Sequence, residues 1–302
     1  MRTSDRSAAG TTYVAALLDA LPDPTAVLDR DGTIALVNDA WRNFSTDNGG
    51  TAETTGVGVN YLEVCARSIT AGCLDAAVVA AGLRRVLEGE TVEVELEYSC
   101  PAPAVGRWFL LRITPIDSDA GGLLISHLNI TRRKMAELDL ERIASHDPLT
   151  GLANRARFME RLTSALAARS GRGAASDIGV LYLDLDGFKP VNDTFGHASG
   201  DEVLQAVASR LRQVIRPQDT AARLGGDEFV VLAPRITNSG MAGLAYRIQV
   251  VLAVPHLIHG QLVEVGASVG SYLAALGEEP ADVVDIADGA MYAAKRARTQ
   301  HG

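Results

Sequence analysis

The segment Arg223–Leu232 constrains this chain more than any other part of the sequence, because it predicts a β-hairpin that carries acids at its tip. Gly225 and Gly226 stand between two apolar runs, which is the pattern of a two-residue hairpin turn. Asp227 and Glu228 follow the glycines directly. Two carboxylates at a buried tip are costly without counter-ions, so we expect positive charge close to this turn.

A second pair of acids ends a predicted strand farther upstream. Residues 178–184 are mainly apolar and run into Asp184-Leu185-Asp186. Side chains two apart on a strand point to the same face, so these two acids are expected to point the same way. Turn capping would explain an isolated pair of this kind better than metal binding does. Together with the hairpin acids, however, it makes four carboxylates from two elements, which predicts a site for Mg²⁺ (or Mn²⁺).

Five motifs in this half of the chain resemble the GGDEF family of diguanylate cyclases. They cover about residues 140–298 in the family's order and spacing, and five matches in register are not a chance event. The resemblance implies a catalytic domain over residues 147–302, with a nucleotidyl-cyclase-like sheet surrounded by helices, that condenses two GTP into cyclic di-GMP and two pyrophosphates. The motifs are Asp147-x-Leu-Thr-Gly-Leu-x-Asn-Arg155, Asp184-x-Asp-x-Phe-Lys189, Asn192-Asp193, Gly196-His197-x-x-Gly200-Asp201 and Gly225-Gly-Asp-Glu-Phe229.

The resemblance also implies which groups carry the chemistry. Asp184 and Asp227 match the family's metal-binding acids, and the carbonyl of Leu185 is implied as a further ligand. Glu228 matches the acid nearest the attacking 3′-hydroxyl, which either helps to deprotonate that hydroxyl or holds a second metal. Because each domain holds one GTP, two domains must face each other, so the resemblance implies that a homodimer is needed for activity.

Substrate contacts follow from the same motifs. Asn192 and Asp201 match the pair that reads guanine, since a carboxylate accepts from N1 and N2 and an amide serves O6 or N3. Further contacts with the nucleotide are implied for Phe188, Lys189, Gly225, Gly226 and Lys295.

One further motif suggests regulation, and the C-terminal run departs from the family pattern. Arg216 and Asp219 form an Arg-x-x-Asp motif at the offset of the family's inhibitory product site, although a surface ion pair is the alternative interpretation. Near the C-terminus, Thr299 stands where a phosphate-contacting Arg is expected, and Arg298 lies one position earlier. The departure leaves the affinity for triphosphate open.

The N-terminal half reads as a different domain, over residues 13–130. We expect a helix over 13–21, a hairpin around Asp31-Gly32, a short helix over 39–44, a loop over 46–58 and a helix over 74–87. Strands are expected over 91–98, 107–115 and 122–129. This order resembles the PAS fold, an antiparallel five-stranded sheet with flanking helices, so the chain as a whole belongs to the mixed α/β class. PAS domains usually leave the last strand through Asp-Ile-Thr, and here Asn129 replaces that Asp.

Residues 131–146 are predicted to form a linker helix between the two halves. Ala136, Leu140 and Ile143 are spaced by four and then three, which is the step of a coiled-coil seam. The run is short, so a solvated single helix is the alternative to a parallel dimer helix. Residues 1–12 are small and polar and are expected to form a disordered lead-in.

Composition excludes some classes of protein. The net charge of −9 argues against a nucleic-acid scaffold, and no apolar run approaches the ~18 residues of a membrane span. No apolar signal segment follows the first arginines, so a cytoplasmic protein is expected. Cys65, Cys73 and Cys100 match no zinc pattern and are expected to be reduced packing residues, with a sensing thiol as the weaker alternative. His127 is interpreted as a packing residue and not as a haem ligand, and the ligand of the sensor is unknown.

Other functions remain to be weighed against a cyclase. A degenerate GGDEF module could act as a weak enzyme or as a receptor for GTP or cyclic di-GMP, but such modules usually lose acids or glycines that are intact here. A cyclase for ATP is disfavoured by Asn192 and Asp201, and a sensor that only dimerises a partner would not need the acids. No Gly-x-x-x-x-Gly-Lys-Ser/Thr run is present, which disfavours a P-loop NTPase. No motif tells which signal the sensor detects or whether that signal activates or inhibits. No motif tells whether the dimer is permanent or which pathway lies downstream.

Overall fold

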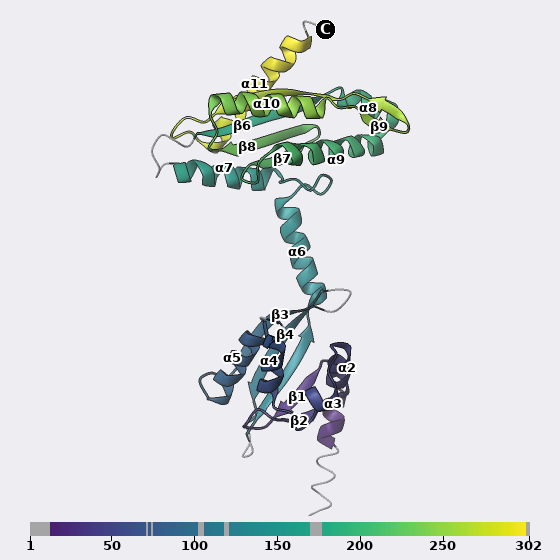
Figure 1. Cartoon of the computed structure of the whole chain (residues 1–302), viewed down its shortest axis with the longest axis vertical. Helices are drawn as coiled ribbons and strands as arrows, with labels where there is room; N and C mark the ends of the chain where they lie inside the picture. The colour runs from purple at the N-terminus through teal and green to yellow at the C-terminus, as the bar shows by residue number, and fades with distance from the viewer. Residues whose placement is uncertain are drawn as a thin grey trace, which may run out of the picture. The chain divides into compact units, whose positions relative to one another are not determined.

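The computed structural model describes residues 13–70, 72–73, 75–101, 106–117, 121–169 and 177–299. The chain divides into two compact units, Met1–Leu138 and Asp139–Gly302, which are treated separately below (Figure 1). The lead-in predicted for residues 1–12 lies outside the described residues. Within the described ranges, no helix combines the length and the hydropathy that crossing a membrane requires.

The first unit is built on one antiparallel sheet of five strands in the order β2-β1-β5-β4-β3. The first two strands form the predicted hairpin, with Gly32 in the left-handed region at φ +81°. The strand predicted over 91–98 begins three residues later and runs to Pro101, and the other two match the prediction within one residue. The strands are β1 (Thr25–Leu28), β2 (Ile34–Val37), β3 (Val94–Pro101), β4 (Gly106–Pro115) and β5 (Leu123–Asn129).

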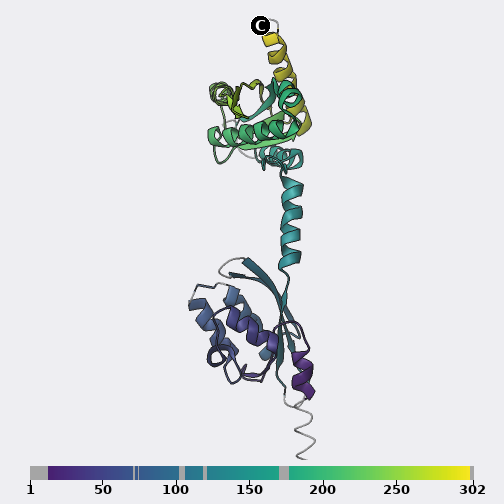
Figure 2. The ribbon, with the colours of Figure 1, turned by 90° about the vertical axis from the view of Figure 1, so that its right-hand side faces the viewer.

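Helices cover one face of this sheet, as Figure 2 shows. The expected loop over 46–58 is partly wrong, because α2 continues to Asp47 and α3 follows it. The indole Nε1 of Trp41 donates to the carbonyl of Thr55 at 2.9 Å, which fixes α3 against α2. Residues 13–19 are also helical, as predicted. The helices on this face are α2 (Asp39–Asp47), α3 (Ala52–Thr55), α4 (Tyr61–Thr70) and α5 (Asp75–Leu87).

The predicted linker helix is present as α6, Thr131–Ser145. Its first turn begins where the side-chain oxygen of Asn129 accepts the backbone N–H of Thr131 at 3.0 Å, so Asn can cap this helix in place of Asp. The division between the two units falls inside the helix. None of its residues is buried, and Leu140 and Ile143 of the predicted seam are 67% and 57% exposed.

The second unit contains a four-stranded antiparallel sheet in the order β11-β6-β8-β7 and a small β9-β10 hairpin. The buried strand and the acid-tipped hairpin predicted from the sequence are both present, as neighbours in this sheet. The strands are β6 (Ile178–Asp186), β7 (Thr220–Gly225), β8 (Glu228–Pro234), β9 (His256–Ile258), β10 (Gln261–Val263) and β11 (Gly266–Leu273). The helices are α7 (Arg155–Arg169), α8 (Phe188–Phe195), α9 (His197–Val214), α10 (Asn238–Leu252) and α11 (Pro280–Thr299).

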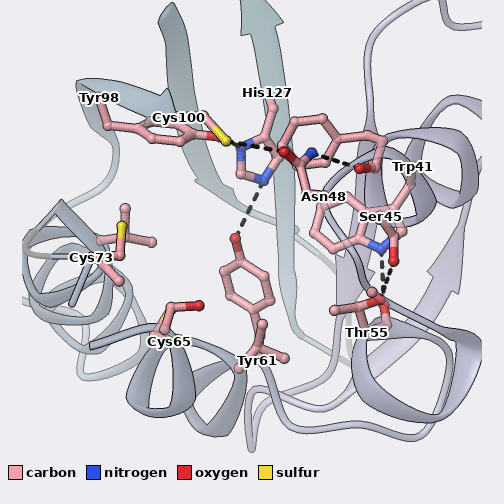
Figure 3. A pocket seen from close by; sticks show the side chains of 16 residues that line it. Trp41, Ser45, Asn48, Thr55, Tyr61, Cys65, Cys73, Tyr98, Cys100 and His127 are labelled. Atoms are coloured by element: carbon pink, nitrogen blue, oxygen red, sulfur yellow. Dashed lines mark hydrogen bonds between the residues drawn. The ribbon is translucent and has the colours of Figure 1, made fainter. Parts of the chain in front are cut away.

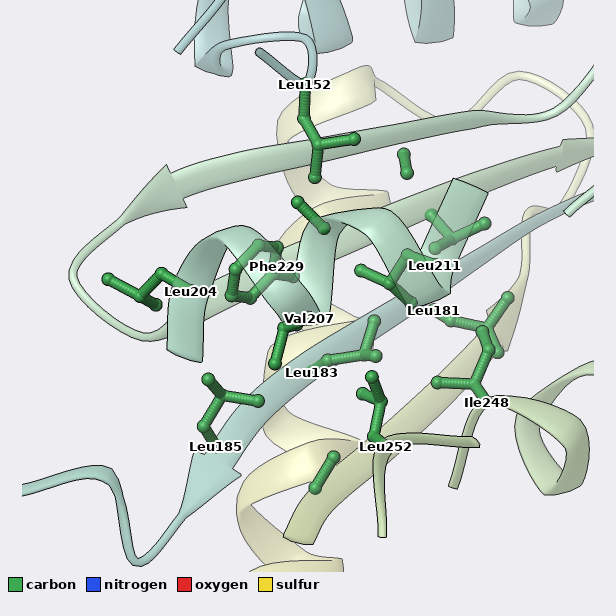
Figure 4. Packing of buried hydrophobic residues seen from close by; sticks show 14 of the residues in the cluster. Leu152, Leu181, Leu183, Leu185, Leu204, Val207, Leu211, Phe229, Ile248 and Leu252 are labelled. Atoms are coloured by element: carbon green, nitrogen blue, oxygen red, sulfur yellow. The ribbon is translucent and has the colours of Figure 1, made fainter. Parts of the chain in front are cut away.

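The period of two along β6 sends alternate side chains to two separate cores. Leu181, Leu183 and Leu185 pack against α8, α9 and α10 (Figure 4). Val180 and Tyr182 point to the opposite face, which α7 and α11 cover. Because the alternation continues to the end of the strand, the acids at positions 184 and 186 fall on the face that carries α11.

Candidate active site

The centre of the candidate site is a row of polar side chains across three strands. Asp184 of β6 lies opposite Glu228, the first residue of β8, and opposite Ser268 of β11. Residues directly opposite each other in an antiparallel sheet share a face, so the three side chains point to the same side. Asp184 and Glu228 are half-buried, as groups at the end of a core must be if they are to meet a ligand.

The hairpin tip lies beside this row. The turn consists of Gly226 and Asp227, one residue later than the predicted Gly225-Gly226 turn, because β7 extends through Gly225 and bulges there. Gly225 and Gly226 have φ values of +155° and +50°, which favour glycine at both positions. The backbone N–H of Leu185 donates to the Asp227 carbonyl at 3.3 Å, so the tip is joined to the end of β6.

An arginine that the sequence analysis did not assign holds this tip in place. The Nε and Nη2 atoms of Arg223 donate to the carbonyl of Gly226 at 2.9 and 2.8 Å. Its Nη1 lies 3.2 Å from the carboxylate of Asp147, and both side chains are mostly buried. Burial opposes ionisation of Asp147, but hydrogen bonds from Thr150 and the Arg223 cation outweigh it and lower the pKa of Asp147. Asp147 is the first residue of one of the five family motifs, so the sequence marked it as a candidate. That Arg223 would be its partner was not evident from the spacing of the motifs.

Positive charge reaches the acids from the last turns of α11. The ammonium of Lys295 lies 2.5 Å from Asp184, and the guanidinium of Arg298 lies 2.7 Å from Asp186. The hydrogen bond to Asp184 raises the pKa of Lys295, and the charges of Asp186 and Asp227 add to the effect. Arg298 also donates to a β11 carbonyl, so it supports the sheet end here instead of standing free for a phosphate. The side chain of Thr299 lies outside the described residues.

The oxygen atoms at this end of the sheet are suitable ligands for a hard divalent cation. The four acids predicted to form the site do not all converge on one point, however. Asp184 and Glu228 offer neighbouring carboxylates, and Leu185 could contribute only its backbone carbonyl, because a leucine side chain has no ligand atom. Asp186 is turned onto Ser268 and Arg298. In the parts of the chain that are described, no three His, Cys, Asp or Glu side chains are grouped to hold a metal. Lys295 supplies the counter-charge at Asp184, so a cation that binds there must replace it.

A tyrosine of the same face was missed from the sequence. Tyr182 lies two residues before Asp184 on β6 and is buried. Burial raises the pKa of its hydroxyl, and the negative charge of Glu228 adds to the shift, so the group stays protonated at neutral pH. Its apolar surroundings in the sequence gave no sign that its hydroxyl would approach the acids.

The two residues predicted to read guanine lie on consecutive helices, Asn192 on α8 and Asp201 on α9. A side chain at Gly200 would collide with the Asn192 amide, since a Cβ there would lie 2.0 Å from its Oδ1. The amide of Asn192 therefore lies over Gly200, next to Asp201, whose side chain is exposed. The absence of a side chain at residue 200 places Asn192, which gives Gly200 a role that the sequence analysis did not state.

Other predicted contacts differ in what they can offer a ligand. Phe188 is 8% exposed and packs in the core beneath α8 and α9, so its side chain cannot contact a phosphate and only its backbone is accessible. Lys189 is exposed. Phe188 and Lys189 are the first two residues of α8, the short helix after β6, so in the sequence both lie close to Asp184 and Asp186.

The Arg-x-x-Asp motif lies at the opposite end of β7 from the hairpin tip. Six residues of strand separate them, or about 20 Å. The buried carboxylate of Asp219 accepts the backbone N–H of Arg216 at 2.9 Å and closes the turn, while the Arg216 side chain is exposed. The motif is therefore not the surface ion pair of the alternative interpretation.

Comparisons with known families agree with both halves of the chain. Residues 144–301, more than half of the chain, match the family described as "Diguanylate cyclase, GGDEF domain". Residues 18–135 match the family described as "PAS fold". Both resemblances recognised in the sequence are confirmed, and so is the mixed α/β fold class.

Curated relatives carry more than one named activity. Diguanylate cyclase DgcP of Pseudomonas aeruginosa is 38% identical over 187 residues, which cover 62% of this chain and 26% of DgcP. Cyclic di-GMP phosphodiesterase PdeR of Escherichia coli is 35% identical over 212 residues, which cover 68% of this chain and 31% of PdeR. The chain thus spans about a quarter to a third of the length of these relatives.

One solved structure of a GGDEF protein is similar to this chain over more than half of its length. The coiled coil and GGDEF domain of DgcB from Caulobacter crescentus, in complex with c-di-GMP, matches with a TM-score of 0.52 and 34% identity. The match covers 56% of this chain and 89% of the DgcB chain.

Proposed function

The chain belongs to the GGDEF family of diguanylate cyclases, and we propose that it condenses two GTP into cyclic di-GMP and two pyrophosphates. The observation that carries the proposal is the Asp184–Glu228 pair beside an intact glycine turn, with Lys295 as its counter-charge. In this proposal residues 13–130 are the sensor, residues 131–146 connect it, and residues 147–302 are catalytic. Because GTP is a cytoplasmic nucleotide, the catalytic half would work in the cytoplasm.

The proposed reaction is a pair of phosphoryl transfers. The 3′-oxygen of one GTP forms a bond to the α-phosphorus of the other, and the bond from that phosphorus to the β-phosphate oxygen breaks. Pyrophosphate leaves with the bonding electrons, and the hydroxyl proton passes to a base or to water. In the second transfer, the 3′-oxygen of the other nucleotide attacks the α-phosphorus of the first in the same way, and this closes the ring. Positioning and electrostatic stabilisation account for most of the catalysis in reactions of this type.

Each acid of the row has a part in this step. Glu228 begins β8 and is proposed to lie next to the 3′-hydroxyl and to accept its proton. Asp184, Asp227 and the Leu185 carbonyl would hold a divalent cation, Mg²⁺ or Mn²⁺, which the family generally needs. Such a cation, when bound, would lower the pKa of the hydroxyl and neutralise charge on the leaving pyrophosphate.

Lys295 is proposed to exchange partners when substrate binds. Without a nucleotide its ammonium neutralises Asp184 at 2.5 Å. A bound triphosphate would offer negative charge to Lys295, and a divalent cation, if held by Asp184, would replace the lysine there as its counter-charge. The side chain is 41% exposed and has four rotatable bonds, so it can turn from the carboxylate to a phosphate.

Selection of guanine is assigned to Asn192 and Asp201. The exposed carboxylate of Asp201 can accept from guanine N1–H and N2–H, whereas adenine has no donor at N1. The Asn192 amide, held over Gly200, can serve O6 or N3. These two groups favour GTP over ATP as the substrate.

Dimerisation is proposed to govern the rate, because each catalytic domain binds one of the two nucleotides. The α6 helix leaves Leu140 and Ile143 exposed in the single chain, and pairing with a second copy would cover them. We assign α6 as a parallel dimer helix through which the sensor sets the distance between catalytic domains.

The test of this function is product formation by the purified chain. With GTP and Mg²⁺, we expect cyclic di-GMP and pyrophosphate, identified by chromatography and mass, and no cyclic product from ATP. Because two chains must meet, the rate per chain should rise with protein concentration and level off once dimers dominate. Absence of product at high concentration, with tight binding of GTP or cyclic di-GMP, would favour the receptor alternative. The intact Gly225–Glu228 turn stands against that alternative.

Feedback by product is proposed at the Arg-x-x-Asp turn. Asp219 is buried and bonded to the Arg216 backbone, so changing it would disturb the turn, but the Arg216 guanidinium is exposed. Arg216→Ala is therefore expected to raise the cyclic di-GMP concentration for half-inhibition by about tenfold, since a bidentate contact to phosphate or guanine is lost. The measurement is initial rate against added product. Arg235→Ala, at an exposed residue beyond β8, is the control; equal inhibition of all three proteins would show that the motif does not bind product.

A further inference from the structure

The first unit contains a pocket of about 220 Å³ between its sheet and helices α2, α4 and α5 (Figure 3). Trp41 enters it from α2, Tyr61 from α4, Tyr98 from β3 and His127 from β5. All four side chains belong to residues 13–138, so the pocket is complete within one unit.

The pocket carries no charge at neutral pH. None of its lining residues is Asp, Glu, Lys or Arg. Burial lowers the pKa of His127 to about 3 and raises the pKa of Cys65 to about 11, so the imidazole is neutral and that thiol is protonated. Burial also raises the pKa of Cys100. Protonated thiols are poor nucleophiles, which argues against a reactive-thiol sensor. An ion would lose its hydration here without compensation.

One arginine is hydrogen-bonded to a residue of the pocket wall. Arg107 lies outside the lining, and its Nη2 donates to the side-chain oxygen of Asn48 at 2.6 Å. Its guanidinium also lies 5.8 Å from the centre of the Phe109 ring. Its Nε is buried without a hydrogen-bond partner, but Arg107 is not among the residues that line the pocket, so it offers no counter-charge inside it.

Aromatic rings make the walls flat. The rings of Trp41 and Phe44 each lie 5.3 Å from the imidazole of His127, and Phe44 is stacked on it at 22°. The Trp41 and Tyr61 rings lie 5.7 Å apart. Walls of this kind favour a planar, apolar body, which can stack or meet the ring edges.

The hydrogen bonds of His127 leave one donor for a ligand. Tyr98 Oη lies 2.7 Å from Nδ1, and Tyr61 Oη lies 3.3 Å from Nε2. A neutral imidazole has one donor nitrogen and one acceptor nitrogen, so one tyrosine donates to the ring and the other accepts from it. We assign Tyr98, the closer of the two hydroxyls, as the donor to Nδ1, which makes Nε2–H the donor to Tyr61; the Tyr61→Phe and Tyr98→Phe variants described below test this assignment.

The tyrosine that accepts from the ring keeps its own O–H. Among the residues that the structure describes, the Tyr61 hydroxyl has no other hydrogen-bond partner. Tyr61 is 7% exposed and, in Figure 3, its ring extends from α4 across the pocket towards His127. A buried hydroxyl hydrogen without an acceptor is unfavourable, so the site is prepared for an acceptor atom supplied by a ligand.

We propose that this pocket binds a small, planar, uncharged molecule whose single hydrogen-bond acceptor, such as a carbonyl oxygen, is held by the Tyr61 hydroxyl. The volume suits one substituted ring, because a cavity of about 150 Å³ already binds benzene. Binding would act on β5, which carries His127 and, two residues later, the Asn129 side chain that caps α6.

The test uses three isosteric probes with the full chain. Acetophenone has the acceptor, α-methylstyrene replaces its oxygen by CH₂, and benzoate carries a negative charge on the same planar frame. Dissociation constants are measured by calorimetry and by tryptophan fluorescence, to which Trp41 in the pocket wall contributes, without any nucleotide, so the result is independent of the cyclase activity. Acetophenone is expected to bind at least about tenfold more tightly than either of the others, as one buried hydrogen bond requires. Equal affinities, a preference for benzoate, or no binding of acetophenone would overturn the proposal.

Two matched variants locate the donor. Tyr61→Phe keeps the ring and removes the hydroxyl, and it should reduce acetophenone binding to the level of α-methylstyrene. Tyr98→Phe removes a hydroxyl that donates to His127 and should have the smaller effect. A larger loss in Tyr98→Phe, or no loss in Tyr61→Phe, would refute the assignment of Tyr61. Thermal unfolding checks that both variants are folded, and the three-probe comparison in the unchanged chain decides the ligand class if either is not.

Discussion

Glu228→Gln is expected to lower the rate of cyclic di-GMP formation by about 10³-fold, the usual contribution of a group that accepts a proton in the transition state. Glu228 is half-buried and lies opposite Asp184 at the end of the sheet. The amide has the same size and shape but cannot accept the proton of the 3′-hydroxyl and is a poorer ligand for a divalent cation. The fold should be unchanged, because the half-buried side chain lies at the end of β8 and not in either core.

The measurement compares initial rates of product formation with GTP and Mg²⁺ at a protein concentration at which the unchanged chain is dimeric. Glu279→Gln is the matched control, since Glu279 is exposed beyond the other end of β11, far along the sheet from Asp184. Its rate should stay within a factor of two of the unchanged chain. If Glu228→Gln turned over GTP as fast as this control, the acid row would not be the catalytic site.

Arg223→Ala is expected to have the second-largest effect, on both stability and activity. The side chain joins the Gly226 carbonyl of the hairpin tip to Asp147. Without it, the carbonyl would lose its hydrogen-bond donor and the Asp147 carboxylate would lose its cation. Removing one member of a mostly buried ion pair leaves an uncompensated charge, so the free energy of unfolding should fall by about 2–3 kcal/mol. The tip that carries Asp227 and Glu228 should lose its fixed position, and we expect a ten- to hundredfold lower rate. Urea unfolding and initial rates measure the two effects.

Arg223→Lys separates the charge from the geometry. A lysine ammonium keeps the attraction to Asp147. It cannot at the same time donate the two hydrogen bonds that the arginine makes to the Gly226 carbonyl. It should therefore recover most of the stability and little of the rate. Full recovery of the rate by lysine would show that the position of the tip does not depend on the guanidinium.

The ion pair also predicts how the stability difference depends on pH. The pKa of Asp147 is lowered in the folded state from its ordinary value of 3.8. A lowered pKa contributes stability above the unfolded-state value and loses it as the pH falls through the folded-state value. The gap in unfolding free energy between the unchanged chain and Arg223→Ala should thus be constant from neutral pH to about 5. It should close as the pH drops below about 4, and a gap that widened there would contradict this role of Asp147.

Several structural features were predictable because they depend on local chemistry. The glycine and acid sequence from Gly225 to Glu228 can form only a tight turn with polar groups at its end. The apolar run before Asp184 indicates a buried strand, and Asn154 directly precedes α7, where its side chain accepts the N–H of Arg157 at 2.9 Å. Each of these inferences involves neighbours within about four residues along the chain.

Other features failed or were missed because they depend on residues that are far apart in sequence. The helix α3 was expected to be loop, since its Thr-rich segment has low helix propensity, but Trp41 holds it by one long-range hydrogen bond. The burial of the Phe188 side chain was also not predicted, because it results from the packing of α8 on α9; a contact of its backbone with the nucleotide stays a prediction. The hairpin turn was placed one residue early, because the bulge in β7 is invisible to composition.

The sequence by itself determined that this chain has two domains, which families they belong to, and which acids lie at strand ends. Only the tertiary structure decided that Lys295 neutralises Asp184, that Arg223 ties the hairpin tip to Asp147, and that Tyr61 has a hydrogen to offer inside the sensor pocket. The reason is physical: a side chain's direction follows from the local backbone, but its charge partner or hydrogen-bond partner depends on which distant segment the fold brings next to it.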